Sequence, residues 1–188
     1  IVFDTGRFLY DNTKPDTFEL IAKLRRIYPL DLESFEYKNS KFPMDTLLPL
    51  KIYIQNIHIQ GDMAYTFISK NDIEFNGVKR LGLNGAYTFI RDNVLRYIQG
   101  VHWSFVVKPN LRKANEWRVS FRSTKGYQEV AKIAEALGGG GHQYSAASKI
   151  QARDSNEATQ KVLQAIAQVT GQNSGNNQQP TPIPSSSP

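Results

Sequence analysis

A run of four glycines, Gly138 to Gly141, followed directly by His142, is the feature that most restricts the fold of this chain. The preceding residues, 127–137, carry apolar side chains at helical spacing, so the first glycine falls where a helix C-cap belongs. One glycine is enough to end a helix, and each additional one adds backbone entropy that folding must overcome. Backbone without Cβ atoms can approach a ligand closely and surround an anion with N–H groups. The alternative is a flexible linker, but a histidine directly after the run favours a ligand-binding loop.

Composition narrows the classes of protein to which the chain can belong. Its 188 residues suffice for one full domain and part of a second. The absence of cysteine excludes disulfides and thiolate metal sites, and no apolar run is long enough to span a bilayer. The 23 Lys and Arg outnumber the 17 Asp and Glu, and the net charge of +6 favours a polyanionic partner. Because the chain begins at Ile1 without a signal-like leader, we expect a fragment of a cytoplasmic protein with no membrane contact.

The first 56 residues predict the end of one domain and a connection to the next. Residues 1–3 form a short apolar run typical of a buried strand, and Asp4 follows at the strand end, where open α/β sheets bind ligands. An aspartate that only caps a turn is the alternative interpretation. After two helical patterns, the polar and proline-ended stretch 38–43 predicts a hinge, and 44–56 predicts another helix.

From residue 57 the pattern changes to strands that alternate with helices. Two runs, 101–108 and 117–122, alternate apolar with polar residues and predict an antiparallel pair with one shared apolar face. The alternation puts Arg122 on the opposite face, at the end of its strand. If the helix over 127–137 packs back across the sheet, Arg122 and the glycine run border one cleft. A solvated strand edge is the alternative for Arg122.

The C-terminal part predicts one more strand and one more helix. The strand is expected over 146–152, and Asp154 with Glu157 is typical of the start of a capped helix. Residues 171–188 are uncharged and rich in Asn, Gln, Ser and Pro, a composition that cannot bury enough apolar surface to order itself. We therefore expect a disordered tail.

Two stretches of this chain carry a family resemblance: FDTGRFLYDNT near the start and VSFRSTKGYQEVAKIAEALGGGGHQYSAASKI near the end. Together they resemble the DHH phosphoesterases of the nanoRNase and pAp-phosphatase type, where pAp is adenosine 3′,5′-bisphosphate. The resemblance covers roughly residues 1–170 and implies an α/β fold, in which the end of a parallel-sheet DHH domain is followed by a smaller, mixed-sheet α/β DHH-associated domain. The implied divisions are a DHH remnant over 1–37, a linker or connecting helix over 38–56, the DHH-associated domain over 57–170 and the tail over 171–188.

The resemblance also implies roles for particular residues. In this family the DHH domain supplies aspartates and histidines for two manganese ions, and Asp4 matches the last of these aspartates. The earlier Asp-x-Asp and Asp-His-His motifs are not in this chain, so we expect the fragment alone to be inactive. Ala147 stands where the family has glycine, which reduces backbone freedom just after the loop. The substrate-contacting set of the family is matched by Arg122, Gly139, Gly140, Gly141 and His142.

The implied function of the whole protein is a manganese-dependent phosphoesterase that hydrolyses very short RNA oligonucleotides and removes the 3′-phosphate of pAp. Two divalent ions would generate a hydroxide, while Arg122 and the glycine N–H groups would hold a phosphate. Closure of the two domains about the 38–43 hinge would control turnover. Two other functions remain open: a phosphodiesterase for cyclic or linear dinucleotides, and a non-catalytic RNA-binding module in which Asp4 is only a turn residue. The sequence leaves open whether the protein forms a homodimer.

Overall fold

The computed structural model describes residues 5, 8, 12–29 and 31–171 of the chain. The expected strand at 1–3, Asp4 and all but the first residue of the expected tail lie outside the described residues. Contacts divide the chain into two units, with the boundary between Lys41 and Phe42. The described part of the first unit consists of two helices, α1 (Pro15–Ile27) and α2 (Leu32–Asn39).

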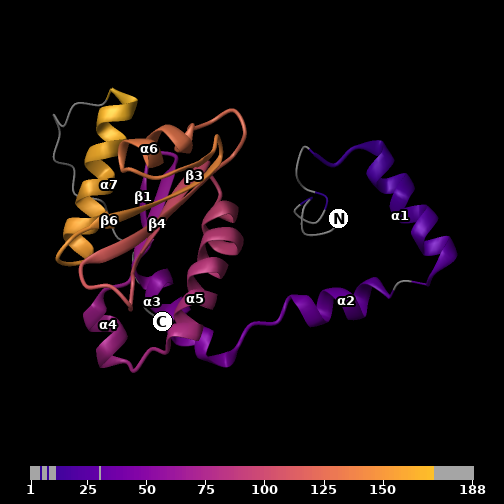
Figure 1. Ribbon diagram of the computed structural model, residues 1–188, viewed down its shortest axis with the longest axis horizontal. Helices are drawn as coiled ribbons and strands as arrows, with labels where there is room; N and C mark the ends of the chain where they lie inside the picture. The colour runs from indigo at the N-terminus through magenta and orange to yellow at the C-terminus, as the bar shows by residue number, and fades with distance from the viewer. Residues whose placement is uncertain (1–4, 6–7, 9–11, 30, 172–188) are drawn as a thin grey trace. The chain divides into compact units, whose positions relative to one another are not determined.

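The second unit is built on a six-stranded sheet with helices on both faces (Figure 1). The strand order is β1-β2-β3-β4-β6-β5, and β2 and β3 are parallel whereas the other neighbours are antiparallel. This mixed α/β sheet confirms the predicted fold class. The strands are β1 (His58–Gln60), β2 (Met63–Phe67), β3 (Trp103–Pro109), β4 (Glu116–Ser123), β5 (Gly140–His142) and β6 (Ser145–Gln151).

Helices α6 and α7 cover one face of the sheet, and α3 and α5 cover part of the other. The predicted start of the last helix is confirmed, because the Asp154 carboxylate caps it by accepting a hydrogen bond from the Glu157 N–H. The helical segments of this unit are η1 (Met44–Thr46), α3 (Leu47–Gln55), α4 (Lys70–Phe75), α5 (Arg80–Phe89), the π-helical turn η2 (Ile90–Val94), η3 (Leu95–Tyr97), α6 (Val130–Ala136) and α7 (Ser155–Thr170).

Two apolar cores lie on opposite faces of the sheet. Phe105 and Trp117 belong to the core under α6 and α7, and Val106 belongs to the core under α3 and α5. Because β3 lies between the two cores, all seven of its residues are buried. The sequence predicted Ser104 and Lys108 on a polar face, but the helices on that side cover them. Alternation identifies the two faces of a strand correctly, but it does not show which face will be covered.

The segment 42–56 belongs to the second unit. Tyr53 of α3 is fully buried in the core on the α5 side, and Leu50 and Ile52 are also buried there. The Thr66 hydroxyl of β2 donates a hydrogen bond of 2.6 Å to the Tyr53 carbonyl, which fixes α3 to the sheet. The apolar residues of this stretch therefore find partners in the second unit, and the boundary at 41/42 lies inside the stretch 38–56 that was expected to be a linker or connecting helix.

Candidate functional site

The glycine run begins as a helix cap, as predicted. Gly138 has a φ of +72°, the left-handed conformation that glycine adopts without strain. The N–H groups of Gly138 and Gly139 donate to the carbonyls of Glu135 and Ala134 at 2.9 and 2.8 Å, which is the hydrogen-bond pattern of a Schellman motif. The helix itself is shorter than expected, because α6 begins at Val130 and not at residue 127.

The rest of the run is an edge strand and not the open loop that the sequence suggested. Gly140 to His142 form β5, which pairs with β6. A Cβ atom on Gly139 would lie 2.2 Å from the Ala147 carbonyl oxygen, and one on Gly141 would lie 2.6 Å from the Ala146 Cα. Both glycines therefore serve the close packing of β5 on β6.

Gly140 differs from the three other glycines of the run. A Cβ atom at this position would meet no atom within 4 Å, and the backbone there does not have the positive φ that favours glycine. The packing and backbone of the described structure therefore explain glycine at 138, 139 and 141 but give no reason for glycine at 140. Glycine at this position would instead allow another molecule to approach the backbone closely.

Arg122, Ser145 and His142 lie side by side on three adjacent strands. Ser145 of β6 is the register partner of both Arg122 on β4 and His142 on β5. Directly opposite residues of antiparallel strands project from the same face, and neighbouring strands are about 4.8 Å apart. The Cα atoms of Arg122 and His142 are therefore about 10 Å apart on one face. The structure brings the two predicted residues together, and their role in binding stays a prediction.

Two further rows follow along the same strands. The next row contains the small residues Ser120, Ala147 and Gly140, and the one after it contains Lys108, Arg118 and Lys149. Helices α3 and α5 cover this side of the sheet at β2 and β3, whereas Arg118, Ala147 and Lys149 are exposed. We call the α5-side surface of β4, β6 and β5 the open face. Its residues are Arg118, Arg122, Gly140, His142, Ser145, Ala147 and Lys149, whereas Ser120 is on the same side of the sheet but is buried beneath Tyr87 of α5.

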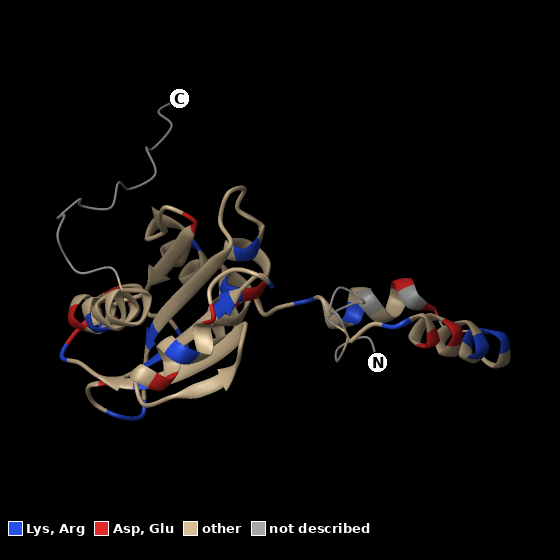
Figure 2. Cartoon of the chain, turned by 90° about the horizontal axis from the view of Figure 1, so that it is seen from above, with Lys and Arg blue, Asp and Glu red and all other residues tan. Residues whose placement is uncertain are grey.

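The open face is basic. Arg118 stands directly opposite Lys149, and like charges in this position destabilise a sheet unless an anion offsets them. The sequence of the second unit contains 16 Lys and Arg against 10 Asp and Glu, and therefore carries the whole net charge of +6. Lys and Arg occur in both units of the chain (Figure 2), but only in the second do they outnumber the acids. The open face therefore favours an anionic ligand.

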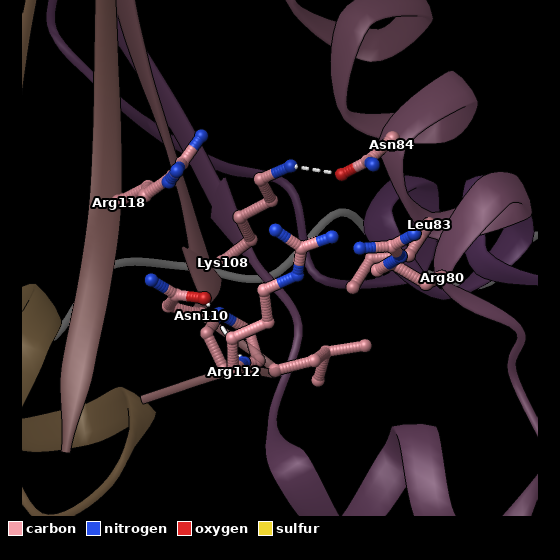
Figure 3. A pocket seen from close by; sticks show the side chains of 9 residues that line it. Arg80, Leu83, Asn84, Lys108, Asn110, Arg112 and Arg118 are labelled. Atoms are coloured by element: carbon pink, nitrogen blue, oxygen red, sulfur yellow. Dashed lines mark hydrogen bonds between the residues drawn. The ribbon is translucent and has the colours of Figure 1, made fainter. Parts of the chain in front are cut away.

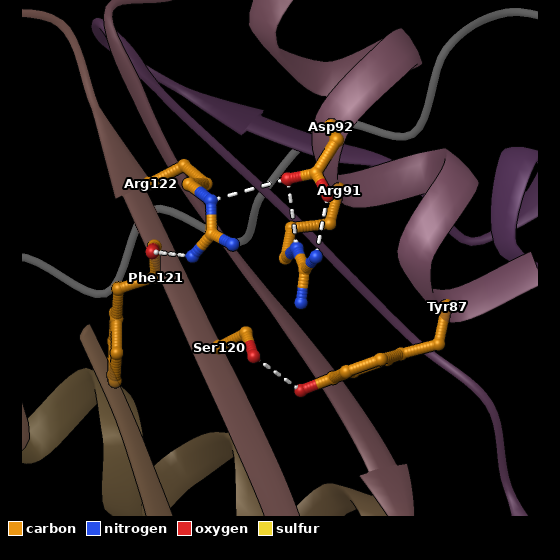
Figure 4. A network of polar contacts seen from close by, with 6 residues as sticks. All are labelled: Tyr87, Arg91, Asp92, Ser120, Phe121 and Arg122. Atoms are coloured by element: carbon orange, nitrogen blue, oxygen red, sulfur yellow. Dashed lines mark hydrogen bonds and ion pairs between the residues drawn. The ribbon is translucent and has the colours of Figure 1, made fainter. Parts of the chain in front are cut away.

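A polar network holds Arg122 in place (Figure 4). The Arg122 Nε donates to Asp92 Oδ1 at 3.1 Å, and its Nη1 donates to the Phe121 carbonyl at 2.9 Å. Asp92 also accepts hydrogen bonds from Arg91. Burial alone would raise the pKa of the Asp92 carboxyl, but Arg91 and Arg122 outweigh that effect and lower the pKa below its ordinary value. Both guanidinium groups donate to the Asp92 carboxylate, which links η2 to the end of β4.

Nothing in the sequence pattern singled out Asp92 and Arg91 as members of the site. Both lie in the π-helical turn η2, which continues α5 and is in contact with β3 and β4. The helical pattern around residues 84–98 extends across α5 and η2 without a break, so nothing in it distinguishes a π turn from an α turn. Such turns are frequent at functional sites, but the sequence alone does not reveal them.

The turn between β5 and β6 is fixed by backbone hydrogen bonds to two other segments of the same chain. The Gln143 carbonyl accepts from the Val130 N–H at 2.9 Å, and the Tyr144 carbonyl accepts from the Ser123 N–H at 3.0 Å. These bonds attach the turn to the start of α6 and to the end of β4. The exposed His142 side chain is therefore presented from a backbone that is already ordered before any ligand binds.

The prediction of a manganese ligand at Asp4 lies outside the described residues. Among the residues that the structure does describe, no three His, Cys, Asp or Glu side chains gather in a way that could hold a metal ion. The role of Arg122, Gly139 to Gly141 and His142 in substrate binding stays a prediction. The described helices include none that is long and apolar enough to cross a membrane.

Comparison with known proteins finds similarity in structure but not in sequence. No family model and no curated protein sequence matches the chain. The fold is similar to that of an exopolyphosphatase-related protein from Bacteroides fragilis, with a TM-score of 0.73 and 18% identity over 90% of this chain and 48% of that one. A pGpG-specific phosphodiesterase from Vibrio cholerae matches at a TM-score of 0.43 and 11% identity over 92% of this chain and 49% of that one, which is too weak to carry an argument. The chain spans about half the length of these proteins.

Proposed function

We propose that this chain is the substrate-binding part of a phosphoesterase that acts on short phosphorylated nucleotides, with pAp and very short oligoribonucleotides as its substrates. The observation that carries the proposal is the row of Arg122, Ser145 and His142 beside Gly140 on an exposed basic face. The fold shared with an exopolyphosphatase-related protein supports a role in the hydrolysis of phosphate compounds.

Each member of the row suits a phosphorylated ligand. A guanidinium can donate to two phosphate oxygens at once, and the Asp92 contact fixes the direction in which the Arg122 guanidinium points. The Ser145 hydroxyl lies between Arg122 and His142 in the register, so the three side chains can donate to neighbouring oxygens of one phosphate and its sugar.

The row of small residues next to it gives the rest of the nucleotide a place to lie. Ala147 and Gly140 project little from the sheet and form a flat floor between the two basic rows. β5 is the last strand in the order of the sheet, so its outer edge pairs with no strand among the described residues. Backbone N–H groups at such an edge can donate to an anion, and glycine lets the anion come close.

Hydrolysis itself is a property of the whole protein. The described residues hold and orient a phosphate but do not form a cluster of metal ligands. The proposed manganese ions would therefore depend on Asp4 and on further ligands beyond the described residues, and we assign no chemical step to them.

The proposal is tested by calorimetric titration of the chain with pAp. We expect one molecule of pAp per chain, and we expect Arg122→Ala to weaken the affinity at least tenfold because a charge-assisted hydrogen bond to phosphate is lost. Arg153→Ala is the matched control, since Arg153 has an exposed side chain that is bound to Glu157 at the start of α7. If pAp does not bind, or if both variants weaken it equally, the proposal is wrong.

Gly140→Ala separates binding from folding. A methyl group at this position meets no atom of the described structure, so we expect unchanged stability and a clear loss of pAp affinity. An affinity equal to that of the unaltered chain would show that Gly140 is not approached by the ligand. Titrations with a linear dinucleotide and with a longer single-stranded RNA test the two alternative functions. Tighter binding of the longer RNA than of pAp would favour the RNA-binding module.

A further inference from the structure

A second basic site lies between α5, the C-terminal end of β3 and the N-terminal end of β4 (Figure 3). It is a pocket of about 230 Å³, which is about eight times the volume of a water molecule in the liquid. Arg118, which borders it, is four residues from Arg122 on β4, and four residues of strand span about 13 Å. The pocket is therefore distinct from the row that contains Arg122 and His142.

The floor of the pocket is a buried cation. Lys108 is only 7% exposed, and its Nζ donates a hydrogen bond of 2.5 Å to the Asn84 side chain on α5. The ammonium also lies 4.3 Å from the centre of the Tyr87 ring. Burial, followed by the charges of Arg118 and Arg91, lowers the pKa of Lys108 to about 8. A lysine in this position is costly to the fold, because it is removed from water without a carboxylate partner.

Three arginines surround the lysine. Arg80 comes from the first turn of α5, Arg112 from the loop between β3 and β4, and Arg118 from β4. Figure 3 shows the Arg80 and Arg112 guanidinium groups turned toward Lys108, with Arg118 beside it. No Asp or Glu is among the described residues that line the pocket, and none of the three arginines forms an ion pair within the described part of the chain. Four cations from separate elements thus meet at one space.

We propose that this pocket binds the phosphoryl groups of a small diphosphate-containing anion, at a site separate from the Arg122 row. Guanidinium groups match phosphate oxygens in geometry, and four cations balance the charge of two phosphoryl groups better than that of one. The volume admits such an anion, and the partly exposed Leu111 on the rim could contact a base or another apolar group attached to it. The ligand is either inorganic pyrophosphate or the diphosphate part of a nucleotide.

The test is calorimetric titration of the full chain with inorganic pyrophosphate at pH 7 and constant ionic strength. We expect one site, with an affinity that falls at least tenfold in Lys108→Met and in Arg118→Gln. Lys132→Met is the matched control, since it removes the same charge from α6 on the opposite face of the sheet, and we expect less than a twofold change. Absence of binding, or equal weakening by Lys108→Met and Lys132→Met, would overturn the proposal. Because Arg118 is exposed, its variant tests the site even if Lys108→Met fails to fold.

Further titrations separate this site from the proposed substrate site. Arg122→Ala should leave pyrophosphate affinity within twofold, and loss of binding in that variant would show that the pocket is not an independent site. Inorganic phosphate should bind at least tenfold more weakly than pyrophosphate, and equal affinity would overturn the assignment to a diphosphate. Equal binding of ADP and pyrophosphate identifies the free anion as the ligand, whereas tighter binding of ADP identifies a nucleotide. Failure of pAp to bind while pyrophosphate binds would refute only the proposed function.

Discussion

Replacing Lys108 by Met should stabilise the second unit while removing a charge from the basic pocket. The native pKa of this lysine is about 8, against an ordinary value of 10.5, because burial disfavours the charged form. At about 1.36 kcal/mol for each tenfold change, this difference corresponds to about 3 kcal/mol by which the charged ammonium destabilises the folded state at pH 7. Methionine has a similar length and no charge, and the exposed Asn84 can bind water in place of the ammonium.

The sign of the pH dependence follows from the same difference. Below pH 8 the lysine is protonated in both states, so its full cost is present, and between pH 8 and 10.5 the unfolded state binds more protons. The free energy of unfolding of the unaltered chain should therefore rise with pH across this window, relative to that of Lys108→Met. The advantage of the variant should fall from about 3 kcal/mol at pH 7 to about 1 kcal/mol at pH 9.5.

Urea denaturation followed by tryptophan fluorescence measures the difference in the free energy of unfolding between the two proteins, both at pH 7 and at pH 9.5. The two tryptophans of the chain, Trp103 and Trp117, are both in the second unit and buried, so their fluorescence reports on the unfolding of that unit. Tyrosine ionisation at high pH affects both proteins alike and cancels in the difference. A variant that is less stable than the unaltered chain at pH 7, or a difference that does not shrink at pH 9.5, would refute the reasoning.

Four other single substitutions test the account of the candidate site. Gly139→Ala and Gly141→Ala should each cost about 1 to 3 kcal/mol, because the added Cβ would overlap the backbone of β6, and thermal denaturation would reveal the loss. Asp92→Asn should lower the free energy of unfolding at pH 7. The difference in stability from the unaltered chain should disappear as the pH falls through the lowered pKa of Asp92. Urea titrations at several pH values would show or disprove this trend. Tyr87→Phe should cost about 1 kcal/mol by breaking the 2.7 Å hydrogen bond to the buried Ser120 hydroxyl, and adding Ser120→Ala should recover part of it in a double-mutant cycle.

Local patterns in the sequence predicted the elements whose partners are close along the chain. Alternation gave the antiparallel β3–β4 pair, and side-chain chemistry gave the cap of α7 at Asp154 and the left-handed Gly138 after α6. Each of these depends on residues that are neighbours in sequence, or on the period of a single strand. Strands that alternate with helices from residue 57 onward were visible in the pattern, whereas the mixed sheet was implied by the family resemblance.

The features that could not be predicted from the sequence depend on contacts between segments that are far apart along the chain. A strand of two glycines and a histidine has little intrinsic preference for β structure, and β5 exists because β6 offers it a partner across a tight turn. Lys108 reads as a surface residue because alternation gives no sign that α5 will cover it. Asp92 joins Arg122 only because η2 lies over β4, 30 residues away in sequence. The structure brings the predicted residues Arg122 and His142 together, whereas Asp92 and Arg91, which hold Arg122 in place, could be identified only from the structure.

The most direct test of the central claim is a titration of the ¹⁵N-labelled chain with pAp, followed by NMR. The account predicts that the backbone amides of Gly140 and His142 shift with a single saturating curve, and that these shifts are lost in Arg122→Ala. If those amides stay in place while the amides of Asn84 and Asn110 at the other basic pocket shift, pAp binds elsewhere and the assignment of the Arg122 row is contradicted.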